Sequence, residues 1–410
     1  MKIMKQEKLF TRDFTMVVAG QIISLFGNAA LRLALPLYLL EVTGSSALFG
    51  LISGLAFLPM ILLAPVGGVV ADRLPKAKMM AGLDFFTCAL TLALAALLDR
   101  APLVPLLLAG LMLLYGIQGA YQPVVSASMP LLAGPEQLIS ANAVINLVSS
   151  LSGLLGPVLG GLLYARMGIA PVLWMSAACF LSSAGMELLI RIPHPPVPLE
   201  RSIGQTVRAD LEESLRFLFQ EQRVLAKGVG LICAFNLLLS AMLIVGLPVI
   251  ITRHLGLGED LYGLAEGAMG LGGLLGGGAA GVLGSRLTPG RSHLTLILCA
   301  GMTGGMALPL ALDAPALVCY GVIVGLTMAI MVLATVFTVV MLSFVQGRTP
   351  EHLVGKVVSC VMALSMCASP LGQVLYGGMF QWLSPWAVVA FSALSSSVVA
   401  LCARRVFQGL

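Results

Sequence analysis

The sequence predicts an all-α integral membrane protein with twelve transmembrane helices, arranged as two six-helix bundles related by pseudo-twofold symmetry. Of its 410 residues, 59% are hydrophobic and only 10% are charged, with a mean hydropathy of +1.01, whereas soluble domains carry about a quarter charged residues. The apolar residues also form long runs, and about 20 of them suffice to cross a bilayer as a helix. Finally, the segment that begins at Gly68-Val69 returns 213 residues later as Gly281-Val282, so we expect two homologous halves.

The apolar runs define the predicted spans. They cover 14–40, 46–71, 79–98, 103–127, 139–165, 168–190, 226–251, 261–284, 293–312, 315–340, 356–379 and 386–403. An even number of spans places both termini on one side, and most of the 23 Lys and Arg residues fall on that side. Positive charge collects in cytoplasmic loops, so we expect both termini in the cytoplasm. The net charge of +5 is then a topology signal and does not indicate nucleic-acid binding.

One long polar interval divides the chain into residues 1–190, a linker at 191–225, and residues 226–410. The linker begins with a proline-rich stretch, in which a helix is disfavoured. Apolar residues then recur at helical spacing at Ile203, Val207, Leu211, Leu215 and Leu218. This pattern predicts an amphipathic helix at the cytoplasmic surface. Binding of a partner is one role for it, but a connector between the bundles is the favoured interpretation.

Several function classes find no support in the sequence. The eight Cys residues lie in apolar spans without metal-ligand spacing, so we expect no metal site and no cofactor. The glycine-rich run at 270–276 lacks the Lys-Ser/Thr of a phosphate loop, and close helix packing explains it better. No nucleophile–base pair is evident either. We therefore do not expect an enzyme or an ATP-driven pump.

A charged motif follows the second predicted span: Gly68-x-x-x-Asp72-Arg73-Leu74-Pro75-Lys76. It resembles the signature of the major facilitator superfamily, although Pro75 stands where the family has Gly. The resemblance covers the whole chain and implies a transporter that alternates access to a central site. It also implies that Asp72 latches the cytoplasmic side against the opposite half, supported by Arg73 and Lys76. The other interpretation is a solvated turn.

Three further features belong to this resemblance. Asp84 is expected to join the charges of the motif, and the second copy of the motif keeps Arg286 but has Ser285 in place of the aspartate. The fifth span contains Ser152, Gly156, Pro157, Gly160 and Gly161, which resemble the antiporter motif of exporting branches; an ordinary packing face is the alternative. Stretches beginning at Gln21 and Glu136 resemble the branch of macrolide efflux proteins, siderophore exporters and the lysophospholipid transporter, in which Asp is common at the position of Asn28.

Two ionisable residues lie deep inside predicted spans, where charge is costly and usually functional. Arg32 is nine residues before Glu41, and Glu266 is six residues after Asp260, so both lie about 9–13 Å from the outer end of their spans. Either they form a pair or network that closes the outer side, or Glu266 carries protons while Arg32 attracts an anionic substrate group. A structural ion pair is the third interpretation. Glu187 and Arg191 have the spacing of a simple helical ion pair.

Spans 1, 4, 7 and 10 line the central cavity in the superfamily. Their polar residues here are Asn28, Tyr115, Gln118, Tyr121, Gln122, Asn236, Ser240 and Tyr320. Few fixed charges and many apolar side chains suit an amphipathic substrate. We therefore expect a monomeric exporter in the lipid of the bacterial inner membrane, which moves an antibiotic, siderophore or similar molecule outward in exchange for protons. The alternatives are a lysophospholipid flippase, an uncoupled facilitator, and a non-transporting sensor on the same fold.

Overall fold

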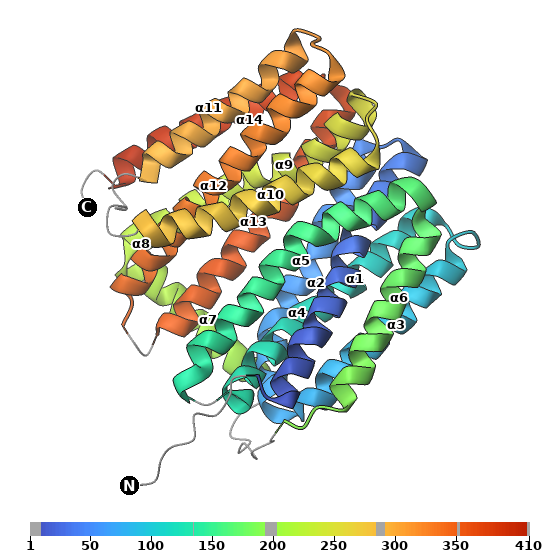
Figure 1. The fold of residues 1–410 in the computed structure, drawn as a ribbon. Helices are drawn as coiled ribbons and strands as arrows, with labels where there is room; N and C mark the ends of the chain where they lie inside the picture. Colours follow the sequence, from blue (N-terminus) through green and yellow to red (C-terminus); the bar gives the residue numbers. More distant parts are fainter. Residues whose placement is uncertain (1–9, 134, 193–202, 284–291, 351–352, 408–410) are drawn as a thin grey trace. The chain divides into compact units, whose positions relative to one another are not determined.

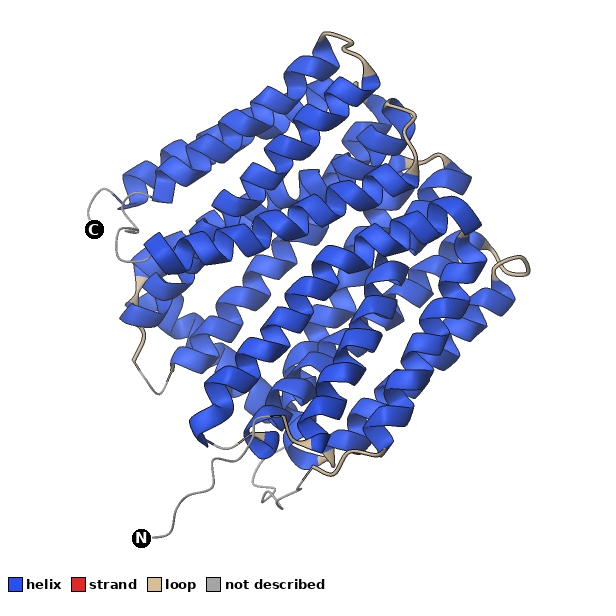
Figure 2. Cartoon of the chain, in the orientation of Figure 1, coloured by secondary structure: helices blue, strands red, loops and turns tan. Residues whose placement is uncertain are grey.

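The computed structural model describes residues 10–133, 135–192, 203–283, 292–350 and 353–407, and within these ranges it contains helices and no strand (Figure 2). The first half comprises α1 (Arg12–Thr43), α2 (Ser46–Arg73), α3 (Lys76–Leu97), α4 (Leu103–Leu132), η1 (Pro135–Gln137), α5 (Leu138–Met167) and α6 (Ile169–Leu188). The second half comprises α7 (Ile203–Arg216), η2 (Phe217–Glu221), α8 (Arg223–Phe235), η3 (Asn236–Ser240), α9 (Ala241–Pro248), η4 (Val249–His254), α10 (Glu259–Leu283), α11 (Ser292–Ala311), α12 (Ala316–Arg348), α13 (Val354–Trp382) and α14 (Pro385–Phe407).

Eleven helices of the described ranges are long and apolar enough to cross a membrane, and each coincides with a predicted span. One of them runs continuously over Arg223–His254, where α8 and α9 alternate with the π-helical turns η3 and η4. The predicted span at 261–284 corresponds to α10, which is not among the eleven. α10 is rich in glycine, which adds little hydropathy. Twelve spans and cytoplasmic termini therefore stay predictions.

The repeat seen in the sequence recurs in the positions at which helices begin. α2 begins at Ser46 and α10 at Glu259, while α4 begins at Leu103 and α12 at Ala316. Both pairs keep the offset of 213 residues. In each half, the two helices also pack closely against each other through a glycine. A Cβ on Gly119 of α4 would lie 2.6 Å from the carbonyl oxygen of Met60 of α2, and a Cβ on Gly276 of α10 would lie 2.6 Å from the carbonyl oxygen of Val332 of α12. The glycine-rich run of α10 is therefore a packing surface, as predicted.

The chain forms two compact units. Unit 1 comprises Met1–Leu35 and Pro59–Gln205, and unit 2 comprises Pro36–Leu58 and Thr206–Leu410. The C-terminal part of α1 and the N-terminal part of α2 thus belong to unit 2, together with most of α7 and all of α8–α14. The assignment of residues 1–190 and 226–410 to two six-helix bundles stays a proposal.

In unit 1, α3 and α6 lie side by side (Figure 1). α6 also packs against α1 through two serines, because the hydroxyls of Ser176 and Ser183 each donate a 3.1 Å hydrogen bond to a backbone carbonyl, of Gly27 and Gly20 respectively. A buried apolar core extends from this contact toward the beginning of α1; it contains Phe14, Val17, Met80, Val124, Val125 and Met129. These contacts fix the positions of four helices around the polar groups described below.

In unit 2, α11 and α14 form the corresponding side-by-side pair (Figure 1). The segment Pro36–Leu58 packs on α13, where a Cβ on Gly377 would lie 2.9 Å from the Cα of Gly50. The side-chain oxygen of Gln381 accepts hydrogen bonds from the backbone N–H groups of Ser46 (3.0 Å) and Ala47 (3.5 Å). These N–H groups have no partner within α2, because the first four N–H groups of a helix have none. Gln381 therefore caps α2.

The predicted amphipathic helix is present as α7, and it is docked on unit 2. Phe217 and Leu218, which follow α7, are buried among Leu225, Val345 and Val357. On its polar side, Lys356 at the beginning of α13 forms ion pairs of 2.8 Å with both Asp210 and Glu213. Within the described ranges, α7 is fastened to unit 2, and its role as a connector between the bundles stays a prediction.

Candidate functional site

Arg32 lies in the middle of α1 and contacts two residues of α4. Its Nη1 donates a 2.8 Å hydrogen bond to the side-chain oxygen of Gln118, and its Cζ lies 4.2 Å from the centroid of the Tyr115 ring. Gln118 and Tyr115 are three residues apart and therefore share a helical face. A cation above a phenol ring is stabilised by about 0.5–2 kcal/mol. Both partners are neutral, so they orient the guanidinium and leave its charge unchanged.

The other predicted cavity residues are distributed over both units. Asn28 and Gln122 are half-buried in unit 1. In unit 2, the amide of Asn236 donates to the carbonyl of Ile232, Ser240 is half-buried, and the hydroxyl of Tyr320 donates to the carbonyl of Leu261 at 2.9 Å. The hydrogen bond of Asn236 stays within its own helix, whereas that of Tyr320 joins α12 to α10. Their role in a substrate cavity stays a prediction.

Glu266 is half-buried in α10. Its Oε1 accepts a 3.0 Å hydrogen bond from the hydroxyl of Tyr262, one turn earlier in the same helix. Arg32 belongs to unit 1 and Glu266 to unit 2. A direct pair between them stays a prediction.

Tyr121 lies apart from Tyr115 and Gln118, in a buried polar cluster that consists of Gln21, Ser24, Asp84, Tyr121 and Glu187. The Nε2 of Gln21 donates to the Tyr121 hydroxyl at 2.7 Å, and this hydroxyl donates to Oε1 of Glu187 at 2.5 Å. The hydroxyl of Ser24 donates to Oδ1 of Asp84 at 3.0 Å. Gln21 and Glu187 have no exposed surface and Asp84 is 3% exposed. The cluster joins α1, α3, α4 and α6 within unit 1.

The expected ion pair between Glu187 and Arg191 is wrong. α6 ends at Leu188, so Arg191 lies beyond the helix and the spacing of four residues has no helical geometry. The backbone N–H of Arg191 instead donates to Asp13 at 3.4 Å. The four-residue spacing between Glu187 and Arg191 gave no indication that Glu187 is buried. The signal that could have revealed it is the helical pattern of apolar and small residues in α6, since Phe180, Ser183, Ala184 and Glu187 share one face.

The charged motif after the second span is described in part. Gly68, Asp72 and Arg73 belong to α2, but their surroundings lie outside the described residues, as does Arg286 altogether. Lys76 is the first residue of α3 and is 7% exposed. Asp84 contacts Ser24 of α1. The latch function of Asp72, and the participation of Asp84 in it, stay predictions.

The motif in α5 packs against α1. A Cβ on Gly160 would lie 2.9 Å from the Cα of Ala30, and one on Gly156 would collide with the Cβ of Ala29. Pro157 lies between them inside the helix, and Gly161 is buried beside them. Close contact between these two helices requires the small residues of the motif. An export function for the motif stays a proposal.

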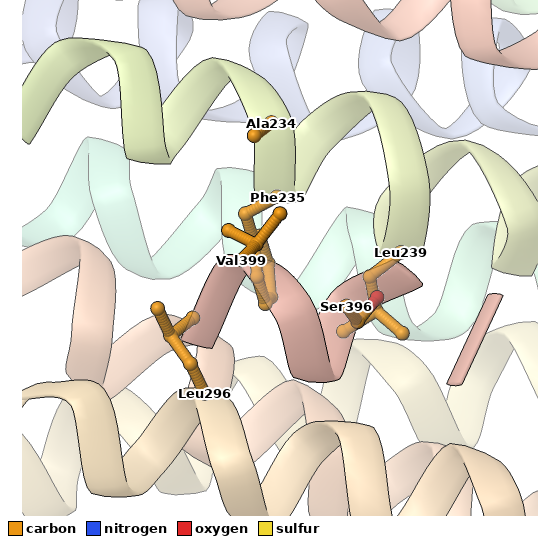
Figure 3. Close-up of a pocket in the computed structure, with 6 residues that line it drawn as sticks. All are labelled: Ala234, Phe235, Leu239, Leu296, Ser396 and Val399. Atoms are coloured by element: carbon orange, nitrogen blue, oxygen red, sulfur yellow. The ribbon is translucent and has the colours of Figure 1, made fainter. Parts of the chain in front are cut away.

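Unit 2 contains a small crevice. Figure 3 shows its lining by Phe235 and Leu239, by Leu296 of α11, and by Ser396 and Val399 of α14, with Ala234 above them. Its cavity volume of about 10 Å³ is far below the roughly 300–1,000 Å³ of ligand pockets. It is also almost wholly apolar, so it is a packing defect and not a substrate site.

The fold and the membrane-spanning helices define a multi-pass membrane transporter. Residues 17–359 match the family model of the Major Facilitator Superfamily, and the chain belongs to this family. A bacterial homologue of the human lysosomal transporter Spinster, solved in an inward-facing conformation, superposes with a TM-score of 0.72 at 14% identity and covers 98% of this chain and 97% of that one. The likeness to this structure concerns the fold.

Among curated proteins, the chain is similar to the enterobactin exporter EntS. It is 27% identical to EntS of Citrobacter koseri over 396 residues, which are 95% of this chain and 90% of that protein. It is 25% identical to EntS of Salmonella typhi over 392 residues, with the same coverage. The chain is therefore a transporter with relatives among exporters, and not an enzyme.

Proposed function

We propose that this protein exports an amphipathic small molecule of the siderophore type across the bacterial inner membrane, in exchange for protons. The observation that carries the proposal is the orientation of Arg32, in the middle of α1, by Tyr115 and Gln118 of α4. A guanidinium in this position attracts a phenolate or carboxylate group of a substrate, while the neighbouring ring stacks on an aromatic part. The sequence similarity of this chain to enterobactin exporters supports the same substrate class.

The proposed cycle follows the fold. Two six-helix bundles, at residues 1–190 and 226–410, alternate between inward-open and outward-open states, with both termini in the cytoplasm and Asp72 as the cytoplasmic latch. The protein acts as a monomer. Glu266, whose carboxylate accepts from Tyr262, carries the proton. Because membrane-embedded carboxylates are costly when ionised, protonation of Glu266 changes the stability of the state in which it is buried.

The test is siderophore secretion by a strain that lacks its own enterobactin exporter and expresses this chain. Arg32→Met removes the charge and its hydrogen bonds, and a charge-assisted hydrogen bond is worth about 1.5–3 kcal/mol. We therefore expect a loss of apparent affinity of roughly 10- to 150-fold, with siderophore retained in the cell. Arg100→Met, at an exposed position after α3, is the matched control and should secrete normally. Normal secretion by Arg32→Met would overturn the assigned role of Arg32.

The energy source is tested in everted membrane vesicles. An imposed pH gradient should drive accumulation of the siderophore, and Glu266→Gln should abolish this drive. Siderophore accumulation that does not depend on the pH gradient would favour the uncoupled facilitator. Transport of lysophospholipid in place of siderophore would favour the flippase.

A further inference from the structure

The buried polar cluster of unit 1 contains two carboxyl groups, Asp84 and Glu187, that have no ion-pair partner among the described residues. The ion pairs Arg208–Glu212, Lys356–Asp210 and Lys356–Glu213 all lie elsewhere. Lys76 is two helical turns before Asp84, about 12 Å along the axis of α3. Burial of an ionised carboxylate without a partner is strongly unfavourable, and two of them in one site are more so. Asp84 and Glu187 therefore cannot both be ionised in this arrangement.

The hydrogen bonds of the cluster lead to the same conclusion. Asp84 accepts a hydrogen bond from Ser24, and Glu187 accepts one from Tyr121, while the hydroxyl of Ser183 beside them donates to the carbonyl of Gly20. Three fully buried oxygens are left without a partner: Oδ2 of Asp84, Oε2 of Glu187 and Oε1 of Gln21. All three can only accept hydrogen bonds, so none can satisfy another. A proton on one of the two carboxyl groups turns one of these acceptors into a donor and removes one of the two charges.

We propose that Asp84 and Glu187 share one exchangeable proton, and that this cluster is a proton-binding site of the transporter, separate from Glu266. The proton enters from water as hydronium donates it to a carboxylate, and it leaves by the reverse transfer. Glu187 is the penultimate residue of α6, so it lies about 1.5 Å along the axis from the helix end. Tyr121 connects Glu187 to Gln21 of α1 and thereby links the state of the proton to the position of α1, the helix that carries Arg32.

The other titratable groups around the site are few. Cys88 follows Asp84 by one turn on the buried face of α3, Tyr121 approaches from α4, and α1 contributes only the neutral Gln21 and Ser24. Beyond the end of α6, Arg191 is exposed and bonded through its backbone to Asp13. Since the phenol and the thiol are neutral near pH 7, the two carboxyl groups are the ones that exchange a proton there.

Infrared spectroscopy of the full-length protein in nanodiscs tests the site without any transport. We expect a carboxylic acid C=O band at pH 7 that decreases as the pH is raised. Asp84→Asn and Glu187→Gln should each change the pH at which this band decreases, and the variant with both substitutions should lack the band, because burial keeps a proton on whichever carboxyl group remains. Asp99→Asn, at an exposed position, is the control and should leave the band intact. A band that survives in the double variant, or that does not respond to pH, would overturn the proposal.

Tyr121→Phe supplies a second variant that keeps both carboxyl groups. It removes the hydroxyl that stabilises the ionised form of Glu187, so the band should persist to higher pH than in the wild type. An unchanged titration in this variant would contradict the assignment to Glu187.

The coupling role rests on the proposed proton-driven export, and vesicle assays separate the two. Glu187→Gln should keep siderophore counterflow within about twofold of the wild type, but lose at least tenfold of the accumulation driven by a pH gradient. If the wild type shows counterflow and no pH drive, proton antiport fails as the function, while the infrared result still decides whether the cluster binds a proton. Full pH drive in Glu187→Gln would overturn the coupling role.

Discussion

The contact between α13 and the segment Pro36–Leu58 makes a quantitative prediction for Gly377→Ala. The added Cβ would lie 2.8 Å from the carbonyl oxygen of Ser46 and 2.9 Å from the Cα of Gly50. Carbon atoms pack best at about 3.5–4.0 Å, so the two helices must separate by roughly 0.6–1 Å. Such overpacking costs about 1–3 kcal/mol, and alanine recovers up to about 1 kcal/mol through helix propensity. With the full 1 kcal/mol recovered, the expected net loss is roughly 0–2 kcal/mol.

The neighbouring residue provides the control. A Cβ on Gly378 meets no atom within 4 Å, so Gly378→Ala should be neutral or stabilising by up to about 1 kcal/mol. Thermal unfolding of the two purified variants in the same detergent compares them directly. If Gly377→Ala unfolds at or above the temperature of Gly378→Ala, the close approach of α13 to α2 does not exist in the protein.

Three further predictions concern single contacts. Gln381→Ala removes the cap of α2 and should lower stability by about 0.5–2 kcal/mol, measured by thermal unfolding; an unchanged melting temperature would contradict the capping role. Gly276→Ala should destabilise the contact of α10 with α12. Gly277→Ala should not, because a Cβ on Gly277 meets no atom within 4 Å. Equal melting temperatures of the two variants would refute the packing of α10 against α12. Lys356→Met breaks two exposed ion pairs, so it should leave the melting temperature almost unchanged while increasing proteolysis near α7. Unchanged proteolysis would show that the apolar contacts alone hold α7.

Much of the fold could be predicted because a membrane imposes simple rules on the sequence. Long apolar runs predicted eleven spans that the structure confirms, and the helical spacing of Ile203, Val207 and Leu211 predicted α7. The helix α10 shows where this method weakens. Its glycines serve packing against α12 and lower the hydropathy that marks a span.

The candidate sites were harder to predict, because their residues come from different helices. Arg32 was recognisable as an intramembrane charge, but its partner on α4 could not be known before the helices were placed. Tyr121 and Gln118 are neighbours in the sequence, yet one contacts Glu187 and the other Arg32. The charge of Glu187 appeared to be explained by Arg191 four residues later, and only the end of α6 at Leu188 removes that explanation.

The division of α1 and α2 between the two units has a mechanical consequence. The boundaries fall between Leu35 and Pro36 and between Leu58 and Pro59, inside continuous helices. A proline follows directly at each boundary and no loop lies there, so any bending of α1 or α2 at these points falls within the helix itself. Proline favours such bending because it has no N–H for the carbonyl four residues earlier. For Pro36 that residue is Arg32, so flexing of α1 reorients the guanidinium that faces Tyr115.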